Sequence, residues 1–104
     1  MSRTTLASKT SGETVIETFD FTSQLTAAET ISTAIVSATV YSGTDATPST
    51  VIFGSTTISG KTVTQKATAG TEGVVYLLTC EITTSLGQTL QMQAFLPIVP
   101  KAAA

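Results

Sequence analysis

Apolar and polar residues alternate along most of the chain, and this period of two predicts short β-strands. The clearest run is 74–83 (VVYLLTCEIT). One of its faces is predicted to point into the core and carries Tyr76, Leu78, Cys80 and Ile82. The opposite face is half apolar and carries Val75, Leu77, Thr79 and Glu81.

Two further runs give strands of the same kind. In 13–21, Phe19 and Phe21 fall on one face, which Glu17 also shares. In the last strand, over 89–99, the apolar positions alternate with a set that contains Phe95, Pro97 and Val99. Proline has no amide donor, so this strand is predicted to lie at a sheet edge by its end. Between these runs, 22–31 is predicted to make a single helical turn that brings Leu25 onto the core.

The middle of the chain is less regular. Over 30–43 the apolar residues switch parity, which predicts either a β-bulge near Ile35–Val36 or burial of both faces of the strand. Turn residues fill 43–49, and a strand over 50–53 is predicted to stop at Gly54. A short strand-and-turn unit at Ile58 and a strand over 61–68 with one polar side complete the set.

Short strands with turn signals every eight to twelve residues indicate a sandwich or barrel. We therefore expect an all-β fold, an immunoglobulin-like antiparallel β-sandwich of about 6–8 strands. The 104 residues give room for one domain. We expect it to divide into an N-terminal arm at 1–12, the sandwich at 13–99 and a C-terminal tail at 100–104.

The composition supports β structure and limits the partners. Charged residues are only 12% of the chain, while Thr and Ser make up about a third of it. The net charge is -2 and the basic residues are scattered, which argues against nucleic acid and against an anionic membrane surface. The N-terminus has no apolar run of signal-peptide length, so synthesis in a reducing cytoplasm is expected.

The side chains for catalysis are largely missing. There is no His, so His-based triads, zinc sites and proton shuttles are excluded. Cys80, the single cysteine, is predicted to be a buried and inert thiol. The seven acidic residues are spread out; Asp45 is interpreted as a solvated turn residue in preference to a calcium ligand. We expect no enzyme, no cofactor and no metal.

Two features suggest a partner protein. The apolar outer face of the 74–82 strand, with Val75 and Leu77, could join Phe95 and Val99 in an interface, or loops could cover it. The N-terminal arm, with Arg3 and Leu6, could also contact a neighbour. These six residues are the candidate contact residues.

Taken in order, the segments 28–49 and 58–99 resemble the fiber-tail adaptor proteins of tailed bacteriophages. That family has a GETI start, a G-x-D-x-x-PS turn, a run of V-x-Q followed by two glycines and Y-x-L, and a TS-x-G turn. The matching positions are Glu29, Thr30, Ile31, Gly43, Asp45, Pro48, Ser49, Val63, Gln65, Gly70, Gly73, Tyr76, Leu78, Thr84, Ser85 and Gly87. Ala28 replaces the first glycine, and the resemblance covers 13–99.

The resemblance implies an immunoglobulin-like structural protein of the virion, at the tail or neck. Its partners would be tail, neck or fiber subunits, around which it would stand in several symmetric copies. Two other functions stay open: a capsid decoration (cement) protein, and a sugar-binding or adhesion module. The missing Trp argues against the last.

Overall fold

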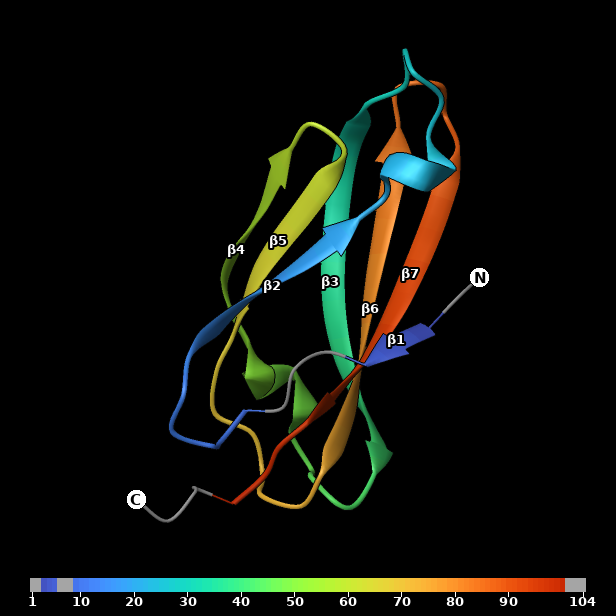
Figure 1. Ribbon diagram of the computed structural model, residues 1–104. Helices are drawn as coiled ribbons and strands as arrows, with labels where there is room; N and C mark the ends of the chain where they lie inside the picture. The colour runs from blue at the N-terminus through green and yellow to red at the C-terminus, as the bar shows by residue number, and fades with distance from the viewer. Residues whose placement is uncertain (1–2, 6–8, 101–104) are drawn as a thin grey trace.

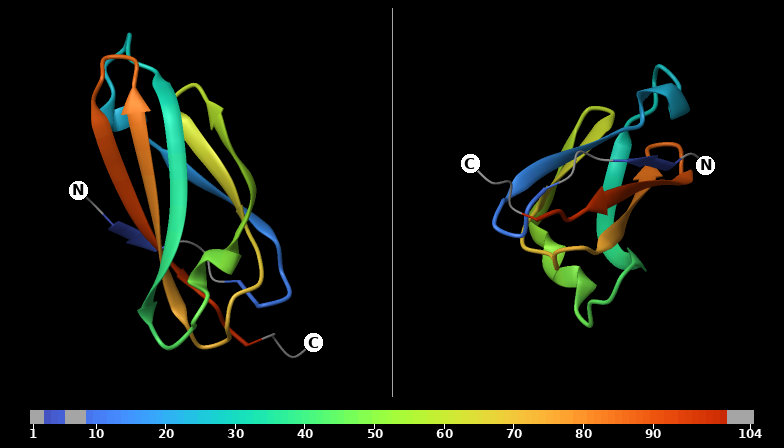
Figure 2. Two further views of the ribbon diagram at one scale, coloured as in Figure 1. Left: turned by 180° about the vertical axis from the view of Figure 1, so that it is seen from behind. Right: turned by 60° about the horizontal axis from the view of Figure 1, so that its bottom comes forward.

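In the computed structural model, seven strands are formed by the described residues, which are 3–5 and 9–100, with side chains from Lys9 onward. Two sheets pack face to face (Figures 1 and 2). The strands are β1 (Arg3–Thr5), β2 (Val15–Asp20), β3 (Ile31–Ser42), β4 (Ile52–Ser59), β5 (Thr62–Ala67), β6 (Val75–Thr84) and β7 (Thr89–Pro97). Within this part of the chain, no helix is long and apolar enough to cross a membrane.

The strand order is that of an immunoglobulin-like sandwich. One sheet has the order β1-β7-β6-β3 and the other β2-β5-β4. All pairs are antiparallel except β1 with β7. Constant-type immunoglobulin domains divide their strands in the same way, with the third, sixth and seventh in one sheet and the second, fifth and fourth in the other. The expected all-β sandwich is therefore confirmed.

The core lies between the inner faces of the two sheets. Tyr76, Leu78, Cys80 and Ile82 are all buried on β6, as the alternation predicted. The opposite sheet contributes the buried side chains of Phe19, Val63 and Ala67. Leu25 is buried just after a short 3₁₀ turn at Thr22–Gln24, so the predicted helical turn is also confirmed.

The bulge in β3 lies elsewhere than predicted. The register shifts between Ile31 and Thr33 and again between Val40 and Ser42, while Ile35 and Val36 pair regularly with β6. The prediction of a bulge at Ile35–Val36 was therefore wrong. The extra residue near the start of the strand produces the same parity switch, because it turns all later side chains over.

The predicted strand end at Gly54 was also wrong. Residues 48–51 form a 3₁₀ turn, and β4 continues through Gly54 to Ser59. A wide bulge interrupts the pairing of β4 with β5 at this point. Phe53 pairs with Lys66, and the next pair is Thr57 with Thr64. Gly54 takes φ 73° at this point, a left-handed conformation that favours glycine.

The N-terminal segment, expected to be an arm, is joined to the sandwich. Arg3–Thr5 form β1 beside Gln93–Phe95 of β7 (Figure 1). Further along, Lys9 bridges to Ile98, and its amide donates to the Pro97 carbonyl at 3.1 Å. As a result β7 is flanked on both sides at Gln93–Phe95 and again by Lys9 at Pro97 and Ile98, whereas residues 89–92 lack β1 as a neighbour.

A candidate protein-binding surface and the contacts that support it

Side-chain hydrogen bonds tie the loops to β6 at both of its ends. Near its start, the Tyr76 hydroxyl donates to Asp45 at 2.5 Å and accepts from the Thr71 amide at 2.8 Å. We call these three residues the Tyr76 clamp. A tyrosine on the penultimate strand that bonds backbone a few residues upstream is the tyrosine corner of immunoglobulin-like sandwiches.

The Tyr76 clamp shifts the ionisation of its members. The hydrogen bond from Tyr76 is the main reason that the pKa of Asp45 is lowered. Burial, and secondly the same bond, raise the pKa of Tyr76. Asp45 is therefore a partly exposed turn residue, as interpreted, whose carboxylate is also bonded to Tyr76.

Gly70 allows the Tyr76 clamp to close. It has φ 97°, and a Cβ there would lie 2.9 Å from the Ile98 side chain and 3.4 Å from the Tyr76 ring. Any side chain at this position would have to push the tyrosine or Ile98 aside. Gly70 is one of the positions that carry the family resemblance.

The second set, which we call the Glu29 clamp, lies at the other end of β6. Glu29 is fully buried and accepts from the Thr84 hydroxyl at 2.5 Å and from the Thr26 amide at 3.2 Å. The Thr84 hydroxyl in turn accepts from the Leu86 and Gln88 amides of the β6–β7 turn. The connection before β3 and the last hairpin are thereby held together.

A third polar group lies inside the sandwich, and its hydrogen bonding is incomplete. Lys9 is buried, and its Nζ donates to the carbonyls of Thr10 at 2.6 Å and Ala69 at 2.5 Å. Glu17 is buried too, and its Oε2 has no hydrogen-bond partner among the described residues. Burial lowers the pKa of Lys9 and raises that of Glu17.

The outer face of the four-stranded sheet divides into a polar half and an apolar half. In the polar half, Gln91 donates to Glu81 at 2.7 Å and Gln93 to Thr79 at 3.3 Å. In the apolar half, Leu77 lies between Thr39 on β3 and Phe95 on β7. This end of the face is the candidate binding surface.

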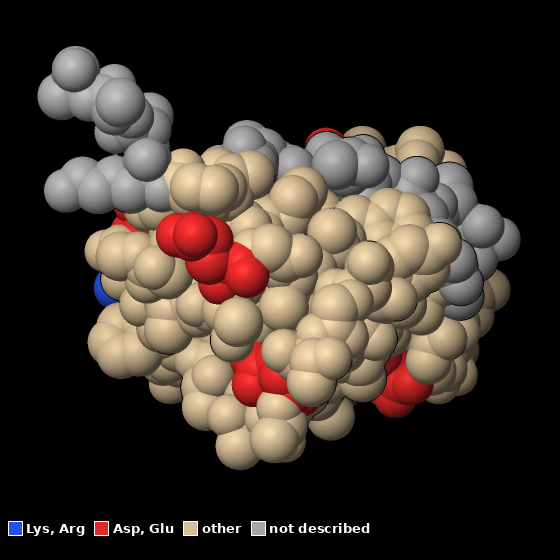
Figure 3. All heavy atoms as spheres, turned by 90° about the horizontal axis from the view of Figure 1, so that it is seen from below, with Lys and Arg blue, Asp and Glu red and all other residues tan. Residues whose placement is uncertain are grey.

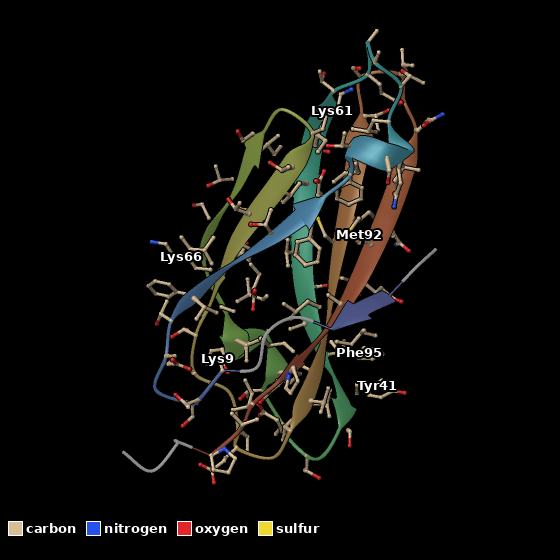
Figure 4. All side chains as sticks on the ribbon, viewed as in Figure 1. Lys9, Tyr41, Lys61, Lys66, Met92 and Phe95 are labelled. Carbon is tan, nitrogen blue, oxygen red and sulfur yellow. The ribbon has the colours of Figure 1, made fainter. Side chains whose placement is uncertain are left out.

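Tyr41 completes the apolar half. Its ring meets that of Phe95 edge to face with centroids 4.5 Å apart, and 59% of the residue is exposed (Figure 4). We call Tyr41, Val75, Leu77 and Phe95 the outer patch. Tyr41 was missed in the sequence because the second irregularity of β3, after Val40, hides which way the side chain points.

The structure brings three of the six candidate contact residues together. Val75, Leu77 and Phe95 are half-buried on the same outer face, as their parity predicted. Val99 is half-buried beyond the end of β7, where its amide donates to the Lys9 carbonyl at 2.8 Å. Arg3 lies in β1, but its side chain is outside the described residues, as is the whole of Leu6.

The described surface carries few charges and no metal-ligating cluster. Seen from below, the molecule shows separate acidic groups on a largely uncharged surface and no cluster of basic ones (Figure 3). In the described parts of the chain, no three metal-ligating side chains gather into a possible metal site. Cys80 is fully buried, and burial raises its pKa to about 12, so it is an inert thiol as predicted.

The family model described as podophage GP4 fiber-tail adaptor protein gp77 matches residues 9–97. The chain belongs to this family. None of the curated proteins matches it. As a fiber-tail adaptor, the chain is a structural protein of the phage tail, which the sequence resemblance had implied.

The two clamps contain residues that carry the sequence resemblance. Glu29, Thr84, Asp45 and Tyr76 are all positions of the resemblance, and all four lie in one clamp or the other. These four residues therefore hold loops onto the sandwich. The outer patch shares none of its four residues with the signature.

Proposed function

We propose that this adaptor joins tail or neck proteins to fiber subunits or to neighbouring tail proteins, and that several copies stand together in the virion. It would act through protein–protein contacts alone, without catalysis. The outer patch is proposed as one of its contact surfaces. The single observation that supports this choice is the exposed Tyr41 ring seated on Phe95 beside Leu77.

The patch has the chemistry of a binding hot spot. Tyrosine is enriched at such sites because it buries a large area and loses few rotamers on binding. Here the ring of Phe95 already orients Tyr41. The polar half of the same face, with its Gln–Glu and Gln–Thr pairs, would form the wet rim that surrounds such a centre.

Incorporation into virions tests the proposal. Phage carrying Tyr41→Asp are expected to lose this chain from purified virions, as measured by mass spectrometry, because the new charge would be buried in the interface. Phe53→Asp is the matched control: Phe53 is 52% exposed on the other sheet, and virions carrying it are expected to keep the chain. Equal incorporation of both variants would contradict the role of the outer patch.

The position in the virion is tested separately. In a reconstruction of the native particle, density for this sandwich is expected between the tail or neck and the fibers. Density at the local symmetry axes of the capsid would instead identify a cement protein. Binding on a glycan array, together with absence from the virion, would identify an adhesion module.

A further inference from the structure

β3 is a long edge strand. It closes one side of the four-stranded sheet and pairs only with β6. In an edge strand, alternate residues point their N–H and C=O groups away from the sheet, and another extended chain can bond to them. Between its two irregularities, residues 33–40 form a regular stretch for such pairing.

Between its two irregularities, β3 lacks the features that usually keep edges apart. Its twelve residues, ISTAIVSATVYS, include no charged residue, no Pro and no Gly. Natural edge strands are commonly protected by lysines, prolines, bulges, very short length or a charge that points inward. On β3, two large apolar residues are exposed instead: Ile35 at 66% and Tyr41 at 59%.

Each of the other three edges of the described sheets carries one of these features. β1 is only three residues long. β2 carries Glu17, which points inward and is buried there. β4 is interrupted by its wide bulge, where the buried Gln65 side chain bonds the carbonyls of Phe53 and Gly54. The contrast makes residues 33–40 of β3 the longest regular stretch among the described edges with no strand paired on its second side.

We propose that β3 pairs antiparallel with β3 of a second copy, joining two four-stranded sheets into one of eight strands. A second copy fits because the strand is uncharged, so identical strands meet without placing like charges opposite one another. The architecture accepts an added strand here, since variable-type immunoglobulin domains extend the corresponding sheet with further strands. The inference rests on the multi-copy part of the proposed function and names the contact.

The alternation of side chains restricts the register. In a continuous sheet, outward residues must lie opposite outward residues, so the twofold axis passes through a residue position. Ser37 is the outward residue at the middle of the regular stretch. Centred there, Ile35 lies opposite Thr39 of the second copy. This is a β-branched pair of the kind that stabilises sheets. The pairing lies in the plane of the sheet, so the outer patch stays available.

Disulfide trapping tests this contact on the purified full chain. Directly opposed residues in antiparallel strands have Cα atoms roughly 4.5–5.5 Å apart, within the range for a disulfide. Ser37→Cys is therefore expected to give a covalent dimer under mild oxidation. The native thiol does not compete, because Cys80 is buried. Thr18→Cys, exposed on the protected edge strand β2, is the matched control and is expected to stay monomeric.

Sedimentation velocity over a range of concentrations gives the second measurement. The native chain is expected to shift from the mass of one chain to that of two as concentration rises. Ser37→Lys, which places two lysines opposite each other, is expected to remain at one, whereas Thr18→Lys behaves as the native chain. Circular dichroism verifies that each variant is folded.

Two results would overturn the inference: Ser37→Cys crosslinking no faster than Thr18→Cys, or a native chain that stays monomeric. Neither result touches the proposed function, because a monomer can still occupy the tail in the reconstruction. Conversely, a dimer that is absent from virions would overturn the proposed function and leave the β3 contact standing.

Discussion

The two sheets of this sandwich present very different surfaces to other proteins. On the outer face of the three-stranded sheet, Thr18, Thr57 and Thr64 lie side by side, and Lys66 lies between the exposed Ile16 and Phe53. A hollow of about 130 Å³ on this face is lined by Ile16, Ser55, Thr57, Thr64, Gln65 and Lys66. On the four-stranded sheet, by contrast, apolar side chains adjoin one another around Leu77.

The edge strands of the two sheets also differ in how well they are protected against pairing with another chain. Both edges of the three-stranded sheet are blunted, one by the buried Glu17 and the other by the bulge around Gly54. The four-stranded sheet ends in the uncharged β3. The edges of the three-stranded sheet are thus protected against pairing with other chains. The four-stranded sheet has both an apolar outer face and an unprotected edge strand on which another chain could bind. The predictions below test that division, from the largest expected effect to the smallest.

The largest effect is expected from two leucines that are neighbours on β6. Leu78 is fully buried in the core, so Leu78→Ala should lower the free energy of unfolding by about 2–5 kcal/mol. Leu77→Ala, on the half-buried outer face, should cost clearly less and should instead weaken incorporation into virions. Urea denaturation of both variants measures the difference. Equal losses of stability would mean that the outer patch is part of the core.

The next effect concerns the bulge of β4. Gln65 is buried, accepts from the Thr56 hydroxyl at 2.5 Å and donates to three backbone carbonyls. Gln65→Leu should lower the free energy of unfolding by about 1–3 kcal/mol, because those carbonyls lose their donor. Gln91→Leu, at an exposed position, is the control and should stay within about 0.5 kcal/mol of the native chain. A stable Gln65→Leu variant would show that the bulge does not depend on this side chain.

The two tyrosines of the four-stranded sheet give a matched pair with a smaller effect. Tyr76→Phe removes the hydroxyl that bonds both Asp45 and Thr71, and should cost about 1–2 kcal/mol. Tyr41→Phe removes an exposed hydroxyl and should change the melting temperature little. If Tyr41→Phe were the more harmful change, the inner and outer roles assigned to the two residues would be reversed.

The smallest effect is the pH dependence of the Tyr76 clamp. The bond from Tyr76 lowers the pKa of Asp45 from its ordinary value of 3.8. A lowered pKa in the folded state adds stability that is complete above the unfolded pKa and is lost as the pH falls through the folded one. The stability gap between the native chain and Tyr76→Phe should therefore be widest near neutral pH and narrow below about pH 4. Denaturation curves over this range measure the gap; a constant gap would mean that Asp45 and Tyr76 do not interact in solution.

The sequence was sufficient for the features that repeat along one strand. Alternation on β6 assigned Tyr76 and Leu78 to the core and Leu77 to the outside, because each strand residue faces opposite to its neighbours. It failed where a register shift breaks that rule, as in the misplaced bulge of β3 and the hidden orientation of Tyr41. A register shift between two paired strands does not change the composition of the sequence, so composition cannot reveal it.

The alternation of apolar and polar residues could not predict polar contacts between residues far apart in the sequence. Glu29 meets Thr84 across 55 positions and Asp45 meets Tyr76 across 31. Nothing in the local pattern distinguishes these acids from solvated ones, and the burial of Lys9 contradicts what its residue type suggests. The family signature marked Glu29 and Asp45 as special, although it could not say that their role is structural.

The pairing of β3 with β6 also sets the order of events during synthesis. Residues 31–42 leave the ribosome well before their only partner strand at 75–84, and β4 and β5 made in between join the opposite sheet. Chains grow at roughly 5–20 residues per second, so β3 waits on the order of seconds for β6. Through that interval the hydrogen-bonding groups on both sides of β3 lack their native partner strand. The folding of β3 therefore depends on non-local pairing, which is intrinsically slow and exposed to aggregation.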